Sequence, residues 1–203
     1  MKLNPKIYKN LNQEPFLEQE IEGVKVAFYD MNETQYLTQY AGRGKFALWT
    51  SNGGDDYKVL IEKSYYEALQ PFYDYDVNKI WIDFLSNAGN ITKKMSRLFL
   101  IPSLIFYVLI STLALLFLED QIVPIFLGVI VVIFGINIFQ TRVTSNKVRE
   151  ANIQAQDQIR ETLGATTFDQ LVVAQEEHYK NYFKFDEEEK VESQDENTNK
   201  EDE

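Results

Sequence analysis

Two long apolar runs dominate the middle of the chain. Residues 98–118 read LFLIPSLIFYVLISTLALLFL without a charged side chain, and residues 122–139 form a second run, interrupted only by Asn137 near its end. A helix rises about 1.5 Å per residue and the hydrocarbon core of a bilayer is about 30 Å thick, so about 20 apolar residues span it. The pattern therefore predicts two transmembrane helices.

The connection between the runs consists of Glu119, Asp120 and Gln121. Three residues suffice for a helix–helix turn but not for a domain, so the two helices are expected to be antiparallel neighbours within a hairpin, residues 98–140. The alternative, two buried helices of a soluble core, is disfavoured by the length of the runs and by their lack of charge.

Basic residues flank both outer ends of this hairpin, whereas the connecting turn carries none. Positive charge near the ends of membrane helices favours the cytoplasmic side. The pattern predicts a multi-pass protein of the cell membrane with both termini in the cytoplasm. The orienting residues are Lys93, Lys94, Arg97, Arg142, Lys147 and Arg149.

Small residues mark one face of each apolar run. Gly128 and Gly135 are seven positions apart, and Ser103, Ser111 and Ala114 give the first run a similar face. Small side chains let membrane helices approach closely. Two interpretations stay open: the seam closes the hairpin on itself, or it receives a second copy or another membrane subunit.

In residues 1–97, helix-like and strand-like segments alternate, which predicts a small α+β domain on the cytoplasmic side. Asn4-Pro5 predicts a short helix over 5–11. Glu22-Gly23 and the segment SNGGDD at 51–56 each separate two strand-like runs, which predicts two β-hairpins. A short helix is expected between Asn32 and Gly42.

Two further helices are predicted before the first apolar run. Ser64 and Glu67 match a capping box, which predicts a short helix reaching Pro71. Apolar residues recur every three or four positions from Val77 to Ala88, which indicates an amphipathic helix, with Asp76 as its cap and Gly89 as its end. The intervening cluster of aromatic residues is interpreted as core and membrane-facing rim, with a recognition surface as the alternative: Tyr65, Tyr66, Phe72, Tyr73 and Tyr75.

The chain after the second run predicts a cytoplasmic helical hairpin over 141–185. The first helix should continue out of the membrane and end at Gly164, and the second should begin at Thr166 or Thr167. Residues 186–203, DEEEKVESQDENTNKEDE, contain one apolar residue, so this acidic tail is expected to be disordered.

Charge and composition narrow the possible partners. The formal charge is −11 over 203 residues, but the tail alone carries −8, which leaves −3 for the rest. No basic stripe is present, so nucleic acid is not an expected partner. The chain has no cysteine, which excludes disulfides, thiolate catalysis and cysteine-ligated zinc.

Motifs for catalysis are not found. A catalytic triad with histidine would have to use His178, which is interpreted as an ordinary surface or rim residue, and no G-x-S-x-G sequence is present. The sequence also lacks HExxH and an EF-hand loop. We therefore expect no catalytic, cofactor or metal site.

Three functional hypotheses follow. The first is a non-enzymatic adaptor or regulator, anchored in the lipid bilayer, that binds another protein or a second copy at the cytoplasmic face. The second is an accessory subunit of a transport, secretion or envelope-synthesis complex, docked through Gly128 and Gly135. The third is a membrane-bound enzyme with a site in residues 1–97, for which the candidate acid/base groups are Asp30, Asp55, Asp74 and Asp76.

Overall fold

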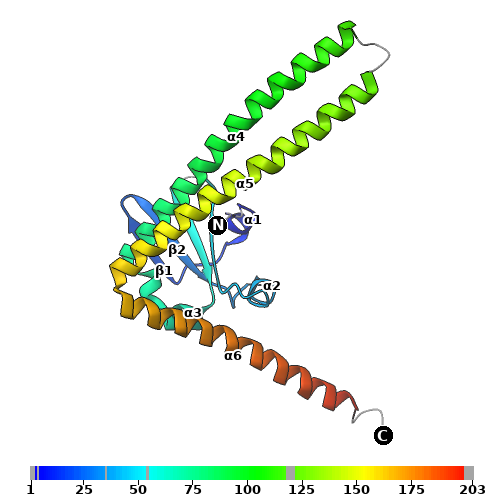
Figure 1. Ribbon diagram of the computed structural model, residues 1–203. Coiled ribbons are helices and arrows are strands. Elements are labelled where there is room, and N and C mark those ends of the chain that lie inside the picture. The colour runs from blue at the N-terminus through cyan, green and yellow to red at the C-terminus, as the bar shows by residue number, and fades with distance from the viewer. Residues whose placement is uncertain (1–2, 4, 35, 54, 118–121, 199–203) are drawn as a thin grey trace. The chain divides into compact units, whose positions relative to one another are not determined.

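The computed structural model describes residues 3, 5–34, 36–53, 55–117 and 122–198 (Figure 1). The chain forms two compact units. One consists of residues 80–158, and the other combines residues 2–79 with residues 159–203. The second unit is a small α+β domain to which a C-terminal helix belongs.

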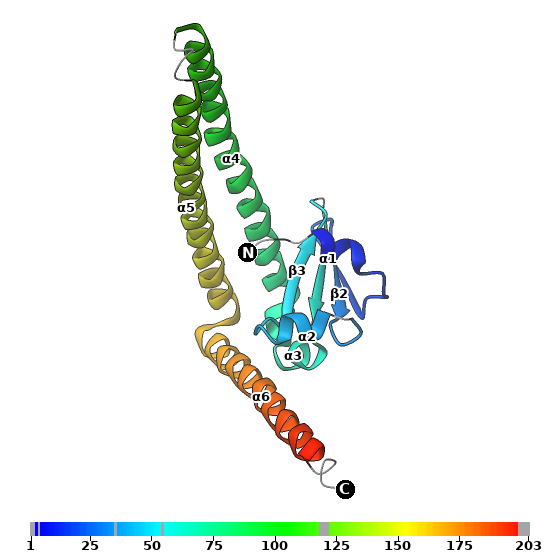
Figure 2. The same cartoon turned by 90° about the vertical axis from the view of Figure 1, so that its right-hand side faces the viewer.

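A four-stranded sheet forms the centre of the α+β domain (Figure 2). Its strands are β1 (Leu17–Ile21), β2 (Val24–Asp30), β3 (Ala47–Ser51) and β4 (Asp56–Ile61), in the order β1-β2-β4-β3. The two outer pairs are antiparallel and the central pair, β2 with β4, is parallel. The two predicted hairpins are confirmed, while the parallel central pair was not predicted.

Turn residues account for the two hairpins. Glu22 and Gly23 both have positive φ, at 52° and 83°. That is the type I′ geometry of a two-residue β-hairpin, whose twist matches the strands it joins. Gly53, in the loop between β3 and β4, has φ 96°.

One face of the sheet packs against helices α1 (Pro5–Asn10) and α2 (Tyr36–Ala41). The predicted helix at 5–11 is confirmed, and α2 begins later than the sequence indicates. Lys58 on β4 donates from Nζ to the carbonyl oxygens of Tyr8 and Leu11, at 3.3 and 2.8 Å, and so fixes the end of α1. The core of this face contains Ile7, Leu11, Ala27, Tyr29, Met31 and Leu60, with Tyr36, Tyr40 and Leu48 against it.

Aromatic residues fill the opposite face. Phe28 is completely buried, and its ring lies 6.3, 5.8 and 6.2 Å from those of Phe16, Tyr66 and Tyr73 (centroid distances). Helix α3 (Lys63–Ala68) and the 3-10 helix η1 (Gln70–Tyr73) supply the tyrosines. Of the predicted aromatic cluster, Tyr65 and Tyr73 are core residues, whereas Tyr75 is exposed.

The chain then forms two long helices, α4 (Tyr75–Phe117) and α5 (Ile122–Leu163). Helix α4 continues through Gly89, which the sequence suggested as an end, and Asp76 lies in its first turn and does not precede it. A single glycine inside a helix costs only about 1 kcal/mol relative to alanine, so Gly89 alone does not end the helix. The predicted boundaries at 97 and 140 thus fall inside continuous helices.

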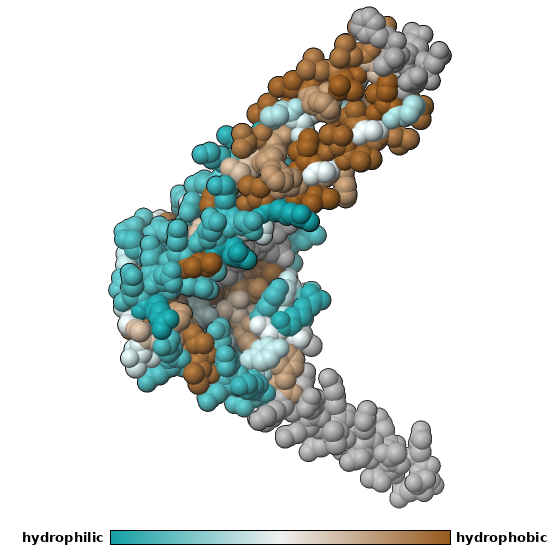
Figure 3. Space-filling view, viewed as in Figure 1, coloured by the Kyte–Doolittle hydropathy of each residue, from teal (hydrophilic) through white to brown (hydrophobic). Residues whose placement is uncertain are grey.

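The apolar parts of α4 and α5 pair in antiparallel fashion. The rings of Phe99 and Phe139, and those of Tyr107 and Phe126, lie 6.1 Å apart. Each helix contains a stretch long and apolar enough to cross a membrane, and only 6% of each stretch is buried (Figure 3). The expected turn at Glu119, Asp120 and Gln121 lies outside the described residues.

Helix α6 (Ala165–Thr198) follows Gly164, whose φ is 79°. The predicted end of α5 at Gly164 is confirmed, but α6 begins before Thr166 and Thr167, so neither caps it. The structure also differs from the predicted tail, because α6 continues to Thr198. Residues 186–198 contain no glycine or proline and are rich in glutamate, a good helix former, so nothing in them ends a helix that has already begun.

Candidate functional site

Helix α6 packs against α3 and the segment before β3 through a cluster of rings. We call this cluster, Phe46, Tyr65, His178 and Tyr182, the α6 seam. The ring of Phe46 stacks on Tyr65 at 5.4 Å and meets Tyr182 edge-on at 5.0 Å. The amide of Gln175 on α6 donates to the hydroxyl of Tyr65. Phe46 and Tyr65 are only 4% and 5% exposed, so the seam belongs to the core of the domain.

A buried carboxylate, Glu62, lies at one end of the seam. It is the N-cap of α3, where it accepts hydrogen bonds from the backbone N–H groups of Ser64 (3.0 Å) and Tyr65 (2.6 Å) and from the Ser64 hydroxyl (2.7 Å). The predicted capping role of Ser64 is therefore wrong. Glu62 lies two positions before Ser64, directly between the end of β4 and the first residue of α3, and its side chain reaches the backbone N–H groups of both Ser64 and Tyr65.

Two opposing effects set the pKa of Glu62. Burial acts to raise it, and the hydrogen bonds from Ser64, from the backbone of Tyr65 and from Asn32 lower it. The hydrogen bonds prevail, so the pKa lies below the usual 4.5. Burial also raises the pKa of Tyr65, which keeps its hydroxyl protonated beside Gln175.

Acid should weaken this domain through Glu62. Since the folded state depresses the pKa, the carboxylate contributes its full stability above about pH 4.5 and loses it as the pH falls through the folded-state value. Glu62→Gln should cost about 1–3 kcal/mol at pH 7, because buried hydrogen bonds to a charge are lost, and should flatten this acid dependence. Denaturant unfolding between pH 3 and 7 measures the free energy of unfolding and its pH dependence. If stability fell with pH as steeply in the variant as in the unaltered chain, Glu62 would not be the source of the acid sensitivity.

His178 contacts that carboxylate from α6. Its Nε2 lies 3.4 Å from Oε2 of Glu62, and 18% of its side chain is exposed. The rings of Phe46 and Tyr65 meet the imidazole edge-on, at 4.8 and 5.1 Å. The interpretation of His178 as an ordinary surface or rim residue gave no sign of these partners, because each of them lies on a segment that precedes both long helices.

Gly44 allows α6 to approach the domain closely. Its φ is +66°, and a Cβ at this position would lie 2.5 Å from Cε2 of Tyr179. Only glycine satisfies both the left-handed backbone and the ring contact. A cavity of about 360 Å³ lies beside this contact, lined by Gly44, Phe46, Tyr65, Gln175, Glu176, Tyr179 and Lys180.

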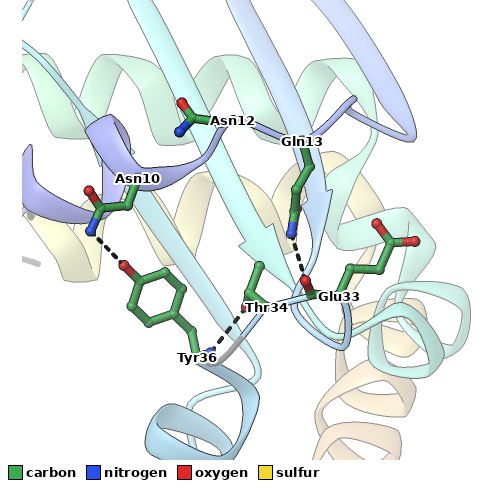
Figure 4. Close-up of a pocket in the computed structure, with 6 residues that line it drawn as sticks. All are labelled: Asn10, Asn12, Gln13, Glu33, Thr34 and Tyr36. Atoms are coloured by element: carbon green, nitrogen blue, oxygen red, sulfur yellow. Dashed lines mark hydrogen bonds between the residues drawn. The ribbon is translucent and has the colours of Figure 1, made fainter.

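A second, polar cavity of about 330 Å³ lies between the segment after α1 and the loop before α2 (Figure 4). Its side chains are largely bonded to their neighbours: Asn10 donates to the hydroxyl of Tyr36, and Gln13 to the carbonyl oxygen of Glu33. The carboxylate of Glu33 points away from Asn10 and Tyr36. The buried Oε1 of Gln13 has no hydrogen-bond partner among the described residues, so it remains an acceptor in the lining of this cavity. Its lining residues are Asn10, Asn12, Gln13, Glu33, Thr34 and Tyr36.

The candidate acid/base groups of the enzyme hypothesis are spread over the domain. Asp30 ends β2, and Asp55 immediately precedes β4, which runs parallel to β2. The two aspartates therefore lie at opposite ends of the central strand pair. Asp74 and Asp76 flank the first residue of α4. Among the described residues, no three histidine, aspartate or glutamate side chains form a cluster that could hold a metal ion.

The predicted packing residues of the apolar helices separate into two groups. Ala114 is 2% exposed, and Ser103 and Ser111 are half-buried. Gly128 and Gly135 are exposed, and a Cβ added at either would meet nothing within 4 Å. The two glycines therefore do not close the hairpin on itself. The predicted orienting residues are all exposed: Lys93, Lys94, Arg97, Arg142, Lys147 and Arg149.

Comparison with known proteins gives no further assignment. No family model, no curated protein and no solved structure matches the chain.

Proposed function

We propose that this chain is a non-enzymatic adaptor or regulator, anchored in the cell membrane, that binds another protein at the cytoplasmic face. In this arrangement α4 and α5 cross the bilayer, and the α+β domain with α6 lies in the cytoplasm. The lipid bilayer and a protein, either a different chain or a second copy, are its partners.

The α6 seam is the observation that supports this proposal. Tyr65 precedes the first apolar helix and Gln175 follows the second, yet their side chains share a hydrogen bond. Segments in contact must lie on the same side of a membrane, so the chain between them crosses it an even number of times. The exposed basic residues at the outer ends of the apolar stretches favour the cytoplasm as that side.

The packing of the α+β domain supports binding over catalysis. Side chains from α1 and α2 cover one face of the sheet, and aromatic side chains cover the other. The candidate aspartates Asp30 and Asp55 lie at opposite ends of the central strands. Co-purification of the full chain in mild detergent tests the role: a chain that repeatedly brings neither a second copy nor another protein with it would contradict an adaptor.

The accessory-subunit hypothesis is favoured by one specific observation, the open space at Gly128 and Gly135. If another membrane helix packs there, replacing both glycines with leucine should release the chain from its complex, because bulk prevents close helix approach. The matched control, Val123→Leu with Ile130→Leu, also changes two exposed positions seven residues apart. Complexes that survive the glycine changes would rule out this surface.

A further inference from the structure

We propose that the basic side chains beside the apolar stretches of α4 and α5 bind anionic phospholipids, whose phosphate groups they hold at the bilayer surface. This inference rests on the membrane anchor of the proposed function and adds the class of lipid that surrounds that anchor. We call the following residues the basic belt: Lys93, Lys94, Arg97, Arg142, Lys147 and Arg149.

The belt begins where the apolar stretches end. The rings of Phe99 and Phe139 lie 6.1 Å apart, which brings α4 and α5 to a common level at this point. Arg97 precedes Phe99 by two positions and Arg142 follows Phe139 by three, so both lie within about 5 Å of this level along their helices. The headgroup region adds about 5–8 Å to each side of the hydrocarbon core, which places both arginines at the depth of lipid phosphates.

The side chains of the belt point away from the hairpin interior. Met95 is only 8% exposed, whereas Lys93 and Arg97, two positions before and after it, are exposed. Two positions turn a helix by about 200°, so these two side chains leave the helix opposite its buried side. On α5, Arg142 and Arg149 are seven positions apart and share an exposed face. The belt is therefore open to the lipids that surround the hairpin.

The positive charge of the belt is not neutralised by the protein. Between Asp83 and Glu150 the only acidic residues are Glu119 and Asp120, in the connection at the far end of the apolar runs. Within the described part of the chain, no belt residue forms a salt bridge. Phosphate is a suitable counter-charge, because arginine binds it with two parallel hydrogen bonds and lysine binds it as a point charge.

The adjoining apolar surface favours a lipid over a soluble phosphate compound. Leu98, directly after Arg97, is 58% exposed, and Phe139, three positions before Arg142, is 59% exposed. A molecule that meets both surfaces must carry acyl chains as well as a negative headgroup. Anionic phospholipids have both parts, and inorganic phosphate has only one.

The test compares two lipids at the surface of the full chain in phosphatidylcholine vesicles. Trace spin-labelled phosphatidylglycerol or phosphatidylcholine is added, and electron paramagnetic resonance measures the fraction that the protein immobilises. We expect phosphatidylglycerol to associate roughly three- to fivefold more strongly, because a basic residue near the surface contributes about fivefold and part of the lipid shell lies away from the belt. Added sodium chloride should lower this preference by screening, whereas inorganic phosphate at equal ionic strength should lower it no further.

Three double variants separate the charge of the belt from other effects. Arg97→Gln with Arg142→Gln removes two belt charges and should lower the preference by roughly half. Arg97→Lys with Arg142→Lys keeps the charges and should keep the preference. Arg43→Gln with Lys45→Gln removes two exposed charges from the α+β domain and should change nothing.

Equal association of the two lipids with the unaltered chain would overturn the belt. So would a preference that survives the belt glutamines, that the lysines abolish, or that the control variant lowers equally. Alkaline carbonate extraction distinguishes this failure from failure of the anchor. A chain that carbonate releases from the vesicles would overturn both, whereas an inserted chain without lipid preference would overturn the belt alone.

Discussion

A cysteine introduced at Gln121 is expected to react with a membrane-impermeant thiol reagent in intact cells, whereas cysteines at Glu67 and Ser193 are expected to react only after lysis. The expected difference is close to all or none. It follows from the two apolar stretches, the connection without lysine or arginine, and the basic residues at both outer ends. The contact between Gln175 and Tyr65 strengthens it, because both flanks must lie together.

The labelling site on the α+β domain must be exposed. Ser51, the last residue of β3, is only 4% exposed, so a cysteine there would report burial and not topology. Glu67 is exposed on α3. The chain has no native cysteine, so no thiol has to be removed before the single cysteines are introduced, and the unaltered chain serves as the control for non-specific labelling. Labelling of Glu67→Cys in intact cells would contradict the cytoplasmic assignment, and with it the proposed adaptor role.

Phe28→Ala should destabilise the α+β domain by about 3–5 kcal/mol, the usual cost of removing a buried phenylalanine. Phe28 is 0% exposed and contacts the rings of Phe16, Tyr66 and Tyr73. Domains of this kind are stable by about 5–15 kcal/mol, so much of that stability would disappear. Unfolding by denaturant, followed by the fluorescence of the buried Trp49 in a Trp81→Phe background, measures the loss.

Phe16→Ala is the matched control for that measurement. Phe16 belongs to the same ring cluster but is 40% exposed, so its removal should cost clearly less than that of Phe28. Equal costs for the two substitutions would contradict the assignment of Phe28 to the centre of this core.

Local features made much of the fold predictable from sequence. Glu22-Gly23 and the glycines at 53 and 54 indicated hairpins because turn chemistry depends on neighbouring residues alone. Long charge-free runs indicated the two apolar helices for the same reason. The parallel pairing of β2 with β4 was not predictable in this way, since it joins strands separated by α2 and β3.

Tertiary contacts account for the features that sequence reasoning missed. Glu62 replaces Ser64 as the cap of α3 because it stands directly between the end of β4 and the first residue of that helix. Helix α4 continues through Gly89, because one glycine costs a helix only about 1 kcal/mol. The partners of His178 lie across both apolar helices in the sequence, so no motif could reveal them. The need for glycine at position 44 arises from its contact with Tyr179 on α6, which no local pattern indicates.

The distance along the chain between the two sides of the α6 seam also determines the order in which this protein can be made. Tyr65 and Gln175 are 110 positions apart, and both apolar helices lie between them. A ribosome synthesises the α+β domain first, so Phe46 and Tyr65 remain uncovered until α6 emerges. Once the first helix has crossed the bilayer in the proposed topology, α6 reaches them only if the second helix crosses as well. A chain whose second helix failed to insert would keep an uncovered aromatic surface, which chaperones and proteases can recognise as a sign of failed assembly.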